Sequence, residues 1–549
     1  MTHKMTREFR AGRGTCFAIF TLTLLVLGLQ TAYGKDKLAK DLEKVDRNAT
    51  VDVIVQFEQT PTEAQDQKVK SKGGMDKASL DLIKGKAYSL PVSALRELAD
   101  DRDVAWISPD RPVKLMMDRT VPAVSADIAK QYGYVGKDVG VAVLDSGVSE
   151  PGDMGGRVAY KQSFVPYAVA DIYGHGTHIA GTIAGIGKDS HSQYRGIAPE
   201  AKIINLKVLG DDGVGTDSSV IAGIQKAIAL KTKYKIRVIN LSLGRPVLES
   251  YTQDPLCQAV EAAWKAGIVV VVAAGNEGRN DSFGNQGYAT ITSPGNDPYV
   301  ITVGAMKTMN TTSRGDDSIA SYSSKGPTLL DHIVKPDIVA PGNRIVSVST
   351  KGTSKLEKAN PANMVGASYF RMSGTSMATP VVSGAVALLL GKEPDLTPDQ
   401  VKARLMKTAS KSFPATSIAT DPVTGQTFTS SYDLFTVGAG YLDIWASLSN
   451  TDAATGSALS PSVDYNPATG TVSLVFGNSV VWGSNVVWGT NVIWGTNVIW
   501  GNSVVWGSNV VWGASGTQGF SVIWGNNVVW GTSGPVTGEA ADIAINGEN

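Results

Sequence analysis

The sequence predicts an α/β fold with a mostly parallel sheet and helices on both of its faces. Two observations lead to this prediction. Near-continuous apolar runs, typical of strands buried on both faces, alternate with helical segments over residues 119–450. Polar residues directly follow several of these runs, as they do at the carboxyl ends of strands in open parallel sheets. With 549 residues the chain is too long for one ordinary core, so we expect more than one domain.

The apolar runs of the central region are expected to be strands. They comprise residues 139–144, 202–209, 237–243, 268–274 and 299–305. Helices are expected between them at residues 218–230 and 256–265. A further helix start is marked at Thr397, where Pro398 takes the first helical position and Gln400 closes a capping box.

A smaller α+β segment is expected ahead of this region, at residues 35–118. Residues 51–57 alternate apolar and polar side chains like a strand. Residues 90–101 are expected to form a short helix and residues 104–108 a second strand. The segment ends in a charged stretch, residues 111–119, which we take as its boundary with the central domain.

Residues 1–34 have the features of a signal peptide, so we expect a secreted protein, extracellular or at the cell surface. Basic residues precede an apolar run at residues 16–29, and Ala32 and Gly34 supply small residues for a signal peptidase. The alternative is an uncleaved membrane anchor, for which the run is short. Removal of the peptide takes Cys16 with it. Cys257 is then a lone cysteine, which excludes an intramolecular disulfide and favours a buried thiol.

The charge balance argues against a nucleic-acid partner. Lys and Arg together number 50, as do Asp and Glu, so the net charge is zero. A protein that binds nucleic acid through its phosphates normally carries a basic surface, and this composition does not suggest one.

Four polar residues at the ends of apolar elements are candidates for chemistry. Asp145 follows the strand of residues 139–144, and Asn276 follows that of residues 268–274. His175 and Ser376 each stand at the start of an expected buried helix. Taken singly, Asp145 fits a turn, Asn276 a loop and Ser376 a helix cap.

Taken together, these residues and their surroundings resemble the subtilisin-like serine peptidases, or subtilases. Six blocks occur in the order of that family: LDSGV, GHGTHIAGTIAG, LSLG, AAGNEG, KPDIVAPG and GTSMATP. The resemblance implies a subtilisin-like fold and a secreted serine endopeptidase that hydrolyses polypeptide substrates through an acyl-enzyme. It makes Ser376 the nucleophile, His175 the general base and Asp145 the group that orients the imidazole. Asn276 and the backbone N–H of Ser376 would form the oxyanion hole.

The resemblance also implies where a substrate binds. Two edge segments would pair with an extended substrate by strand addition, and a third segment would line the primary pocket. The edge residues are Ser242, Leu243 and Gly244 on one side and Gly213, Val214 and Gly215 on the other. The pocket residues are Ala273, Ala274 and Gly275. Thr292 stands where many subtilases have glycine, which predicts a shallower pocket.

By the same resemblance, residues 35–118 are an inhibitory propeptide that assists folding and is cut away between Leu115 and Ser125. The alternative is a permanent N-terminal domain. No cofactor is required for the chemistry. The family often binds structural calcium, but residues 185–196 lack its asparagine-containing ligand stretch, so calcium is expected without assigned ligands. His175 and His178 lack the acidic residue and third ligand of a zinc peptidase, and His178 is expected to be packed.

The C-terminal region carries a Trp-Gly repeat. After a linker at residues 451–471, ten hexads that end in glycine run from residue 472 to 531 and precede a tail at residues 532–549. The β-branched residues and the frequent glycines favour short strands, as in a solenoid or a roll. Three interpretations stay open: binding to polysaccharide or a cell surface, self-association, or an extension packed on the catalytic domain. Two other functions also stay open, a structural surface protein that its peptidase domain only matures and an inactive subtilase-like binding protein.

Overall fold

The computed structural model describes residues 37–42, 45–115, 123–282, 284–309, 311, 313–421, 424–466, 471–475 and 547–548. The chain divides into two units, Met1–Lys37 and Leu38–Asn549, and every helix and strand below belongs to the second. The expected signal peptide and nearly all of the Trp-Gly repeat lie outside the described residues. Their predicted roles therefore stay predictions.

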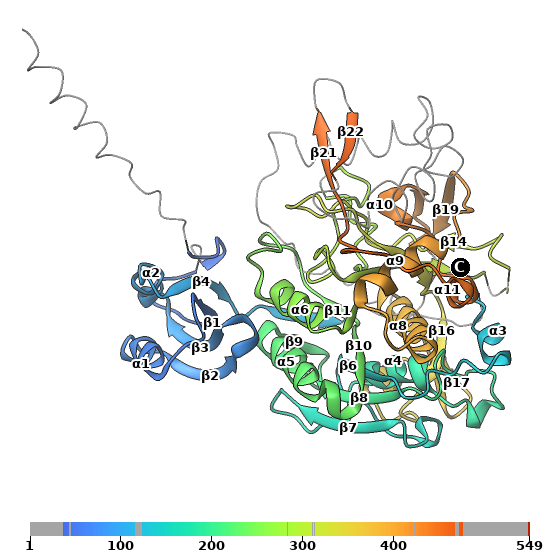
Figure 1. The fold of residues 1–549 in the computed structure, drawn as a ribbon, viewed down its shortest axis with the longest axis horizontal. Helices are drawn as coiled ribbons and strands as arrows, with labels where there is room; N and C mark the ends of the chain where they lie inside the picture. Colours follow the sequence, from blue (N-terminus) through green and yellow to red (C-terminus); the bar gives the residue numbers. More distant parts are fainter. Residues whose placement is uncertain are drawn as a thin grey trace, which may run out of the picture. The chain divides into compact units, whose positions relative to one another are not determined.

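An eight-stranded, mostly parallel sheet forms the centre of the predicted catalytic domain, residues 119–450, which is called the catalytic unit below (Figure 1). Its main path runs β14-β13-β12-β10-β6-β8-β7, and β15 also pairs with β13. Only β14 is antiparallel to its neighbour. The strands are β6 (Gly140–Asp145), β7 (Val158–Ser163), β8 (Lys202–Lys207), β10 (Ile236–Leu241), β12 (Val269–Ala273), β13 (Ile301–Lys307), β14 (Ser318–Ile319) and β15 (Ile338–Pro341). The predicted fold class is confirmed, because the continuous apolar runs are these buried strands.

Helices cover both faces of this sheet. Helices α4 (His175–Ala184) and α8 (Thr375–Lys392) pack together on one face, and α5 (Asp217–Tyr234) and α6 (Pro255–Lys265) pack together on the other. In the described part of the chain, α8 is the one helix long and apolar enough to cross a membrane, but it is buried in this core. The predicted capping box opens α9 (Pro398–Thr408), with Thr397 and Gln400 in the expected roles.

The N-terminal segment has its own sheet and its own apolar core. The four antiparallel strands are ordered β2-β3-β1-β4. The elements are β1 (Thr50–Phe57), α1 (Glu63–Ser71), β2 (Met75–Leu80), η2 (Asp81–Ile83), β3 (Gly85–Pro91), η3 (Val92–Ala94), α2 (Leu95–Ala99) and β4 (Val104–Pro109). The next strand, β5 (Pro112–Leu115), leaves this sheet and pairs with β9 (Val214–Thr216) and β11 (Leu243–Gly244) of the catalytic unit.

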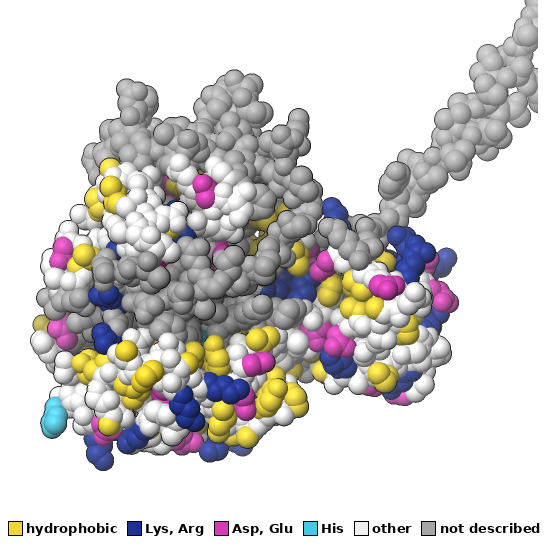
Figure 2. Space-filling model, turned by 180° about the vertical axis from the view of Figure 1, so that it is seen from behind, with side chains coloured by type: hydrophobic (Ala, Val, Ile, Leu, Met, Phe, Trp, Pro, Cys, Tyr) yellow, Lys and Arg dark blue, Asp and Glu magenta, His cyan; other side chains and the backbone are white. Residues whose placement is uncertain are grey.

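The remaining elements are short. They are α3 (Ala126–Gln131), η4 (Gly152–Met154), η5 (Lys188–Ser190), α7 (Lys355–Ala359), η6 (Pro361–Asn363), α10 (Leu434–Val437), α11 (Ile444–Ser449) and the strands β16 (Ile345–Val348), β17 (Met364–Val365), β18 (Tyr369–Met372), β19 (Thr416–Thr420) and β20 (Thr427–Ser431). Figure 2 shows basic and acidic side chains mixed over the visible face, as the zero net charge predicts.

A hairpin of β21 (Ser462–Asn466) and β22 (Thr471–Val475) lies where the sequence analysis places the linker and the first hexad. The linker therefore contains a strand that composition alone did not indicate. Its cause is tertiary: residue Ser462 forms a bridge to Ile333, and the amide of Val463 donates to the carbonyl of His332 at 2.9 Å. These contacts attach the hairpin to the catalytic unit.

Candidate active site

Asp145 and His175 meet at the carboxyl end of the parallel sheet. Asp145 is the last residue of β6, and His175 is the first residue of α4. The His175 Nδ1 atom lies 2.7 Å from Asp145 Oδ1, and neither side chain is exposed. A carboxylate accepts hydrogen bonds, so this contact places the ring proton on Nδ1 and leaves Nε2 to act as a base. A Cβ at Gly176 would lie 2.0 Å from the carbonyl oxygen of Gly147, so glycine is required where α4 starts this close to β6.

A buried carboxylate that the sequence analysis missed holds this pair in place. Asp171 Oδ1 accepts from the Ser146 hydroxyl at 2.8 Å and from the Gly174 amide at 2.7 Å. Its Oδ2 accepts from the Thr177 amide at 2.8 Å and from the Thr177 hydroxyl at 2.6 Å. Burial raises the pKa of Asp171, and the bonds from Thr177 and Gly174 oppose that shift. The available signal was an acidic residue four positions before a histidine that starts a helix.

Ser376 stands in the first turn of α8, next to the turn between β10 and β11. Its hydroxyl donates to the carbonyl of Ser242 at 3.0 Å, and the Ser242 hydroxyl donates to the carbonyl of Ser376 at 2.8 Å. The side-chain amide of Asn240 donates to Ser242 Oγ at 2.9 Å. These reciprocal bonds fix the candidate nucleophile against one of the two predicted substrate-binding edges.

The side-chain oxygen of Asn276 is bound by the residue that precedes Ser376. Its Oδ1 accepts from the backbone N–H of Thr375 at 2.9 Å and from the Thr375 hydroxyl at 3.1 Å. With the oxygen engaged by the residue before Ser376, the amide nitrogen is the part of the side chain left to donate. The backbone N–H of Ser376 lies in the first turn of α8, where N–H groups have no partner within the helix. The Asn276 side-chain nitrogen and the Ser376 backbone N–H are therefore the two candidate donors to an oxyanion.

The two predicted edges flank a strand of the same chain. In the sheet β11-β5-β9, Leu115 pairs with Leu243, and Lys114 pairs with both Gly244 and Val214. Val113 pairs with Gly215, and Gly213 lies just ahead of β9. The end of the N-terminal segment thus occupies the position that the sequence analysis assigned to a substrate.

The predicted pocket residues lie at the end of β12 and just beyond it. The Ala274 amide donates to the carbonyl of Val303 at 3.0 Å, and the Thr292 amide donates to the carbonyl of Ala274 at 3.0 Å. Thr292 is buried, and its side chain contacts the positions where Gly244 and Gly275 would carry a Cβ. Thr292 therefore fills space between Gly244 and Gly275, and the shallower pocket stays a prediction.

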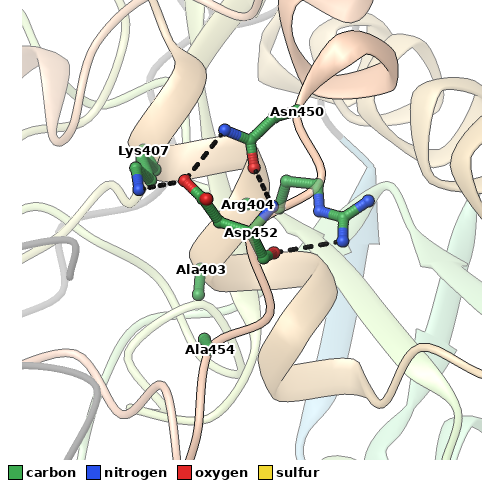
Figure 3. Close-up of a pocket in the computed structure, with 6 residues that line it drawn as sticks. All are labelled: Ala403, Arg404, Lys407, Asn450, Asp452 and Ala454. Atoms are coloured by element: carbon green, nitrogen blue, oxygen red, sulfur yellow. Dashed lines mark hydrogen bonds and ion pairs between the residues drawn. The ribbon is translucent and has the colours of Figure 1, made fainter.

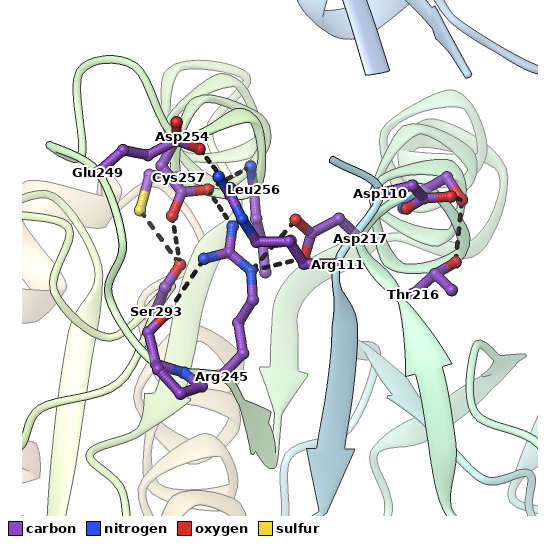
Figure 4. A network of polar contacts seen from close by, with 12 residues as sticks. Asp110, Arg111, Thr216, Asp217, Arg245, Glu249, Asp254, Leu256, Cys257 and Ser293 are labelled. Carbon is purple, nitrogen blue, oxygen red and sulfur yellow. Dashed lines mark hydrogen bonds and ion pairs between the residues drawn. The ribbon is translucent and has the colours of Figure 1, made fainter. Parts of the chain in front are cut away.

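The end of the N-terminal segment is also bound by buried charges (Figure 4). Arg111 donates to the two carboxyl oxygens of Asp41 at 3.0 Å each and forms an ion pair with Glu249. Arg245 bridges Asp217 at 2.8 Å and Asp254 at 2.7 Å. Burial raises the pKa of Glu249 to about 7, although Arg111 opposes the shift. Burial likewise raises the pKa of Asp217 to about 6 against the effect of Arg245.

The residues around the loop after α4 do not fit a calcium ion. Asp153 Oδ1 accepts from the amide of Asp189 at 2.8 Å, and its Oδ2 accepts from the hydroxyl of Tyr369. The Asp189 carboxylate accepts from Ser368 at 2.6 Å and lies 3.6 Å from Lys351, a cation that disfavours a second one. In the described ranges no three His, Cys, Asp or Glu side chains are grouped to hold a metal. Calcium stays a prediction without a site.

His178 has the packing role expected of it. The ring is buried, and its Nε2 lies 3.2 Å from the carbonyl oxygen of Ile345 and 3.1 Å from that of Phe370. Burial, and then the nearby His175, lower the pKa of His178 to about 3, so the ring is neutral at physiological pH. This histidine supports two chain segments that flank the active site.

The cavity drawn in Figure 3 lies elsewhere, between α9 and residues 450–454. It is crossed by an ion pair of Lys407 with Asp452 and by a bond from Arg404 to the Asp452 carbonyl at 3.1 Å. None of the candidate catalytic residues lines it, so it has no part in the chemistry.

Comparisons with known proteins place this arrangement among proteases. The model of the subtilase family, Peptidase_S8, matches residues 136–440. The serine protease AprX of Bacillus subtilis (strain 168) is 39% identical over 386 residues, which cover 67% of this chain and 85% of AprX. Subtilisin E of the same organism is 36% identical over 369 residues, covering 65% and 84%. Fervidolysin from Fervidobacterium pennivorans, a keratinolytic enzyme related to subtilisin, has a crystal structure that matches with a TM-score of 0.58 at 22% identity. The match covers 76% of this chain and 63% of that one, and it is a likeness of fold.

Proposed function

The chain belongs to the subtilase family of serine endopeptidases, and from this premise we propose that it is a secreted zymogen that cuts off its own N-terminal segment. The observation that carries the proposal is the position of β5. This strand connects the N-terminal sheet to the catalytic unit and lies between β9 and β11. Ser242, which directly precedes β11, accepts a hydrogen bond from the Ser376 hydroxyl. An extended chain added between two enzyme edges is the binding mode of a peptide substrate.

The proposed chemistry uses four residues. The Ser376 oxygen attacks the scissile carbonyl carbon while His175 Nε2 takes the hydroxyl proton. Asp145 stabilises the imidazolium that forms. The side-chain amide of Asn276 and the backbone N–H of Ser376 donate to the oxyanion. The proton on His175 then passes to the leaving nitrogen, the C–N bond breaks, and an acyl-enzyme remains on Ser376. Attack by water, with His175 again as base, releases the acid and restores the serine.

The strand register supports one particular cut. Residues 114 and 115 pair with Gly244 and Leu243. If this register continued by one residue, Met116 would face Ser242. The carbonyl of Ser242 accepts from the Ser376 hydroxyl at 3.0 Å, so the residue opposite Ser242 is the one beside the nucleophile. We therefore propose the Met116–Met117 bond as the cleaved bond. Both residues lie outside the described ranges and within the interval predicted from the sequence.

The buried contacts of the segment support an inhibitory role after the cut. Arg111 is buried against Asp41 and Glu249, and the Ser218 amide at the start of α5 donates to Asp110 at 2.7 Å. A segment held in this way would stay in the substrate cleft as a bound product. Protease activity on other polypeptides would then appear only after its release. Polypeptide substrates and the propeptide are accordingly the partners that we propose.

The test is the intact mass of the secreted full chain and of its Ser376→Ala variant, both made in a protease-poor host. We expect the first to begin at Met117 and the variant to keep the N-terminal segment, beginning where the signal peptide ends. Ser447→Ala is the matched control. Ser447 lies on α11 with only a local bond to the Ile444 carbonyl, so this chain should mature normally. A Ser376→Ala chain that still begins at Met117 would show that another protease makes the cut.

A further inference from the structure

Two residues close to the end of the chain lie in a polar pocket of the catalytic unit. Glu548 is 1% exposed. The 71 residues between β22 and Gly547, residues 476–546, lie outside the described ranges. Its backbone is recognised from both sides by one side chain. The Glu548 N–H donates to Asn343 Oδ1 at 3.0 Å, and the Asn343 side-chain amide donates to the Glu548 carbonyl at 2.9 Å. A paired contact of this kind fixes a peptide unit as a neighbouring strand does.

The Glu548 carboxylate has a set of donors of its own. Arg279 Nη2 lies 2.7 Å from it, and Lys307 Nζ lies 3.3 Å from it. The Ser321 amide donates to its two oxygens at 3.0 and 3.2 Å, and the Ser321 hydroxyl donates as well. A buried carboxylate is stable only when it is paired and hydrogen-bonded, and these donors meet that condition.

The pocket is built independently of the residue that fills it. Arg279 forms an ion pair with Asp421, donates to Ser321 Oγ at 2.7 Å and stacks 4.4 Å from the ring centre of Phe428. These contacts hold the guanidinium in place from three sides. Two buried cations, Arg279 and Lys307, both contact the Glu548 carboxylate.

The pocket also selects the residue before the glutamate. Gly547 has a φ of 66°, and a Cβ at this position would lie 2.3 Å from Ser373 Oγ. A larger residue would meet both a strained backbone and a side chain three positions ahead of Ser376. The pocket therefore fits a Gly-Glu dipeptide rather than any acidic residue.

We propose that this pocket is a docking site for Gly547–Glu548 of the same chain, so that the chain is bound to the catalytic unit both before and after residues 476–546. The first attachment is the β21–β22 hairpin, which is bound to the catalytic unit at His332 and Ile333. The second attachment is Gly547–Glu548. Residues 476–546, with nine of the ten hexads complete among them, connect the two.

The docking site lies beside the catalytic residues without using them. Ser373 comes three residues before Ser376, Arg279 comes three residues after Asn276, and Lys307 ends β13 at the carboxyl edge of the sheet. The proposal does not depend on hydrolysis, because a Ser376→Ala chain keeps every contact that it needs.

The test is trimming of the full-length Ser376→Ala chain by a carboxypeptidase, followed by intact mass. We expect the parent chain to lose Asn549 and then to resist. Asn343→Ala leaves the tail sequence, and hence the preference of the carboxypeptidase, unchanged. It removes both backbone contacts of Glu548, so trimming past residue 548 should accelerate about 10-fold or more. Asn450→Ala, which removes a side-chain bond near Asp452, is the matched control and should behave like the parent.

A second variant avoids any change to the catalytic unit. Gly547→Ala should accelerate trimming to the same extent, because its Cβ collides with Ser373, whereas Gly538→Ala, in the tail outside the described residues, should not. Equal trimming rates in the parent, Asn343→Ala and Gly547→Ala chains would overturn the proposal. Rapid trimming of all of them would also overturn it, since it would show a tail that is not docked. A Gly547→Ala effect without an Asn343→Ala effect would place the tail in a different site.

Discussion

The two ends of the described chain both dock on the catalytic unit, but by different means. The N-terminal segment arrives as a folded sheet with its own core and inserts β5 between β9 and β11. The C-terminal tail arrives as two residues whose backbone and carboxylate are each bound by specific side chains. The first contact is mostly backbone pairing in the cleft, and the second depends on a glycine and a glutamate.

If the N-terminal segment is released as proposed, this difference explains how one protein could keep one end and discard the other. Backbone pairing accepts many sequences, so a substrate could then take the place of β5. The tail pocket accepts a carboxylate after a glycine, and nothing in the substrate cleft competes for it. The two docks therefore predict opposite fates: release for the N-terminal segment and retention for the tail.

Among the variants that test this difference, Arg111→Met is expected to have the largest effect, which is faster release of the N-terminal segment. The change removes the cation from a buried ion pair and leaves Glu249 uncompensated, which typically costs about 3–5 kcal/mol. After self-cleavage the segment should leave about 100-fold faster or more, seen as a shorter lag before peptide hydrolysis begins. Arg102→Met, at an exposed position of the same segment, is the control. An unchanged lag would mean that backbone pairing alone holds the segment.

Asn276→Asp should come next in size. Aspartate keeps an oxygen for the bonds from Thr375 but replaces the donor nitrogen by an acceptor. Loss of one oxyanion donor lowers turnover by about 100- to 1000-fold. If β5 is bound as a substrate, self-cleavage and hydrolysis of an added peptide should slow by the same factor, while carboxypeptidase trimming of the tail stays unchanged. If only one of the two reactions slowed, the N-terminal segment and the added peptide would not be cleaved at the same site.

Features that depend on residues close together in the chain were predicted from the sequence, whereas contacts between residues far apart in the chain were missed. The buried strands and the Thr397 capping box follow from patterns within a few residues, and the structure contains them. The blocks around Asp145, His175 and Ser376 indicated the candidate catalytic residues through family resemblance, and each block includes a residue at the end of a strand or the start of a helix. The contact between Asp145 and His175 then follows from the parallel sheet, which brings strand ends to one edge.

The tail pocket could not be predicted in this way. Its partners come from Arg279, Ser321 and Asn343, which are separated from Glu548 by 205 residues or more. No periodicity or motif links a glutamate in a polar tail to an asparagine after β15. The same holds for Arg111 and Glu249, which are 138 residues apart: the sequence indicated a charged boundary but not its partner.

A smaller effect, on stability, should come from acid acting through His178. The pKa of His178 is lowered to about 3, so between pH 6.5 and 3 the unfolded chain takes up a proton that the folded chain refuses. Stability from this group is complete above pH 6.5 and is lost as the pH falls, by about 2 kcal/mol at pH 5.

The measurement is urea unfolding of the catalytic unit in the full Ser376→Ala chain at pH 7.5 and pH 5. His178→Gln should lose less stability between the two values than the parent, and His191→Gln, at an exposed position, should match the parent. Because His178 bonds the carbonyls of Ile345 and Phe370, near Asn343 and Ser373, acid should also speed trimming of the tail. Identical pH dependence in all three chains would assign the acid loss to the carboxylates instead.

The smallest effect should come from Gln56→Ala. This variant tests whether the N-terminal segment is held by a few strong contacts or by many weak ones. Gln56 donates to Gln258 of α6, but its own Oε1 is buried without a hydrogen-bond partner among the described residues. Removing the side chain therefore deletes an unsatisfied atom together with the bond, and Gln258 keeps its bond to the Thr252 carbonyl at 3.0 Å. We expect a change of about 1 kcal/mol or less, or up to about 5-fold in the lag before activity. An effect as large as that of Arg111→Met would show that the segment is held by contacts across its whole interface. The N-terminal segment and the tail would then differ mainly in the area that each buries, and not in the kind of contact.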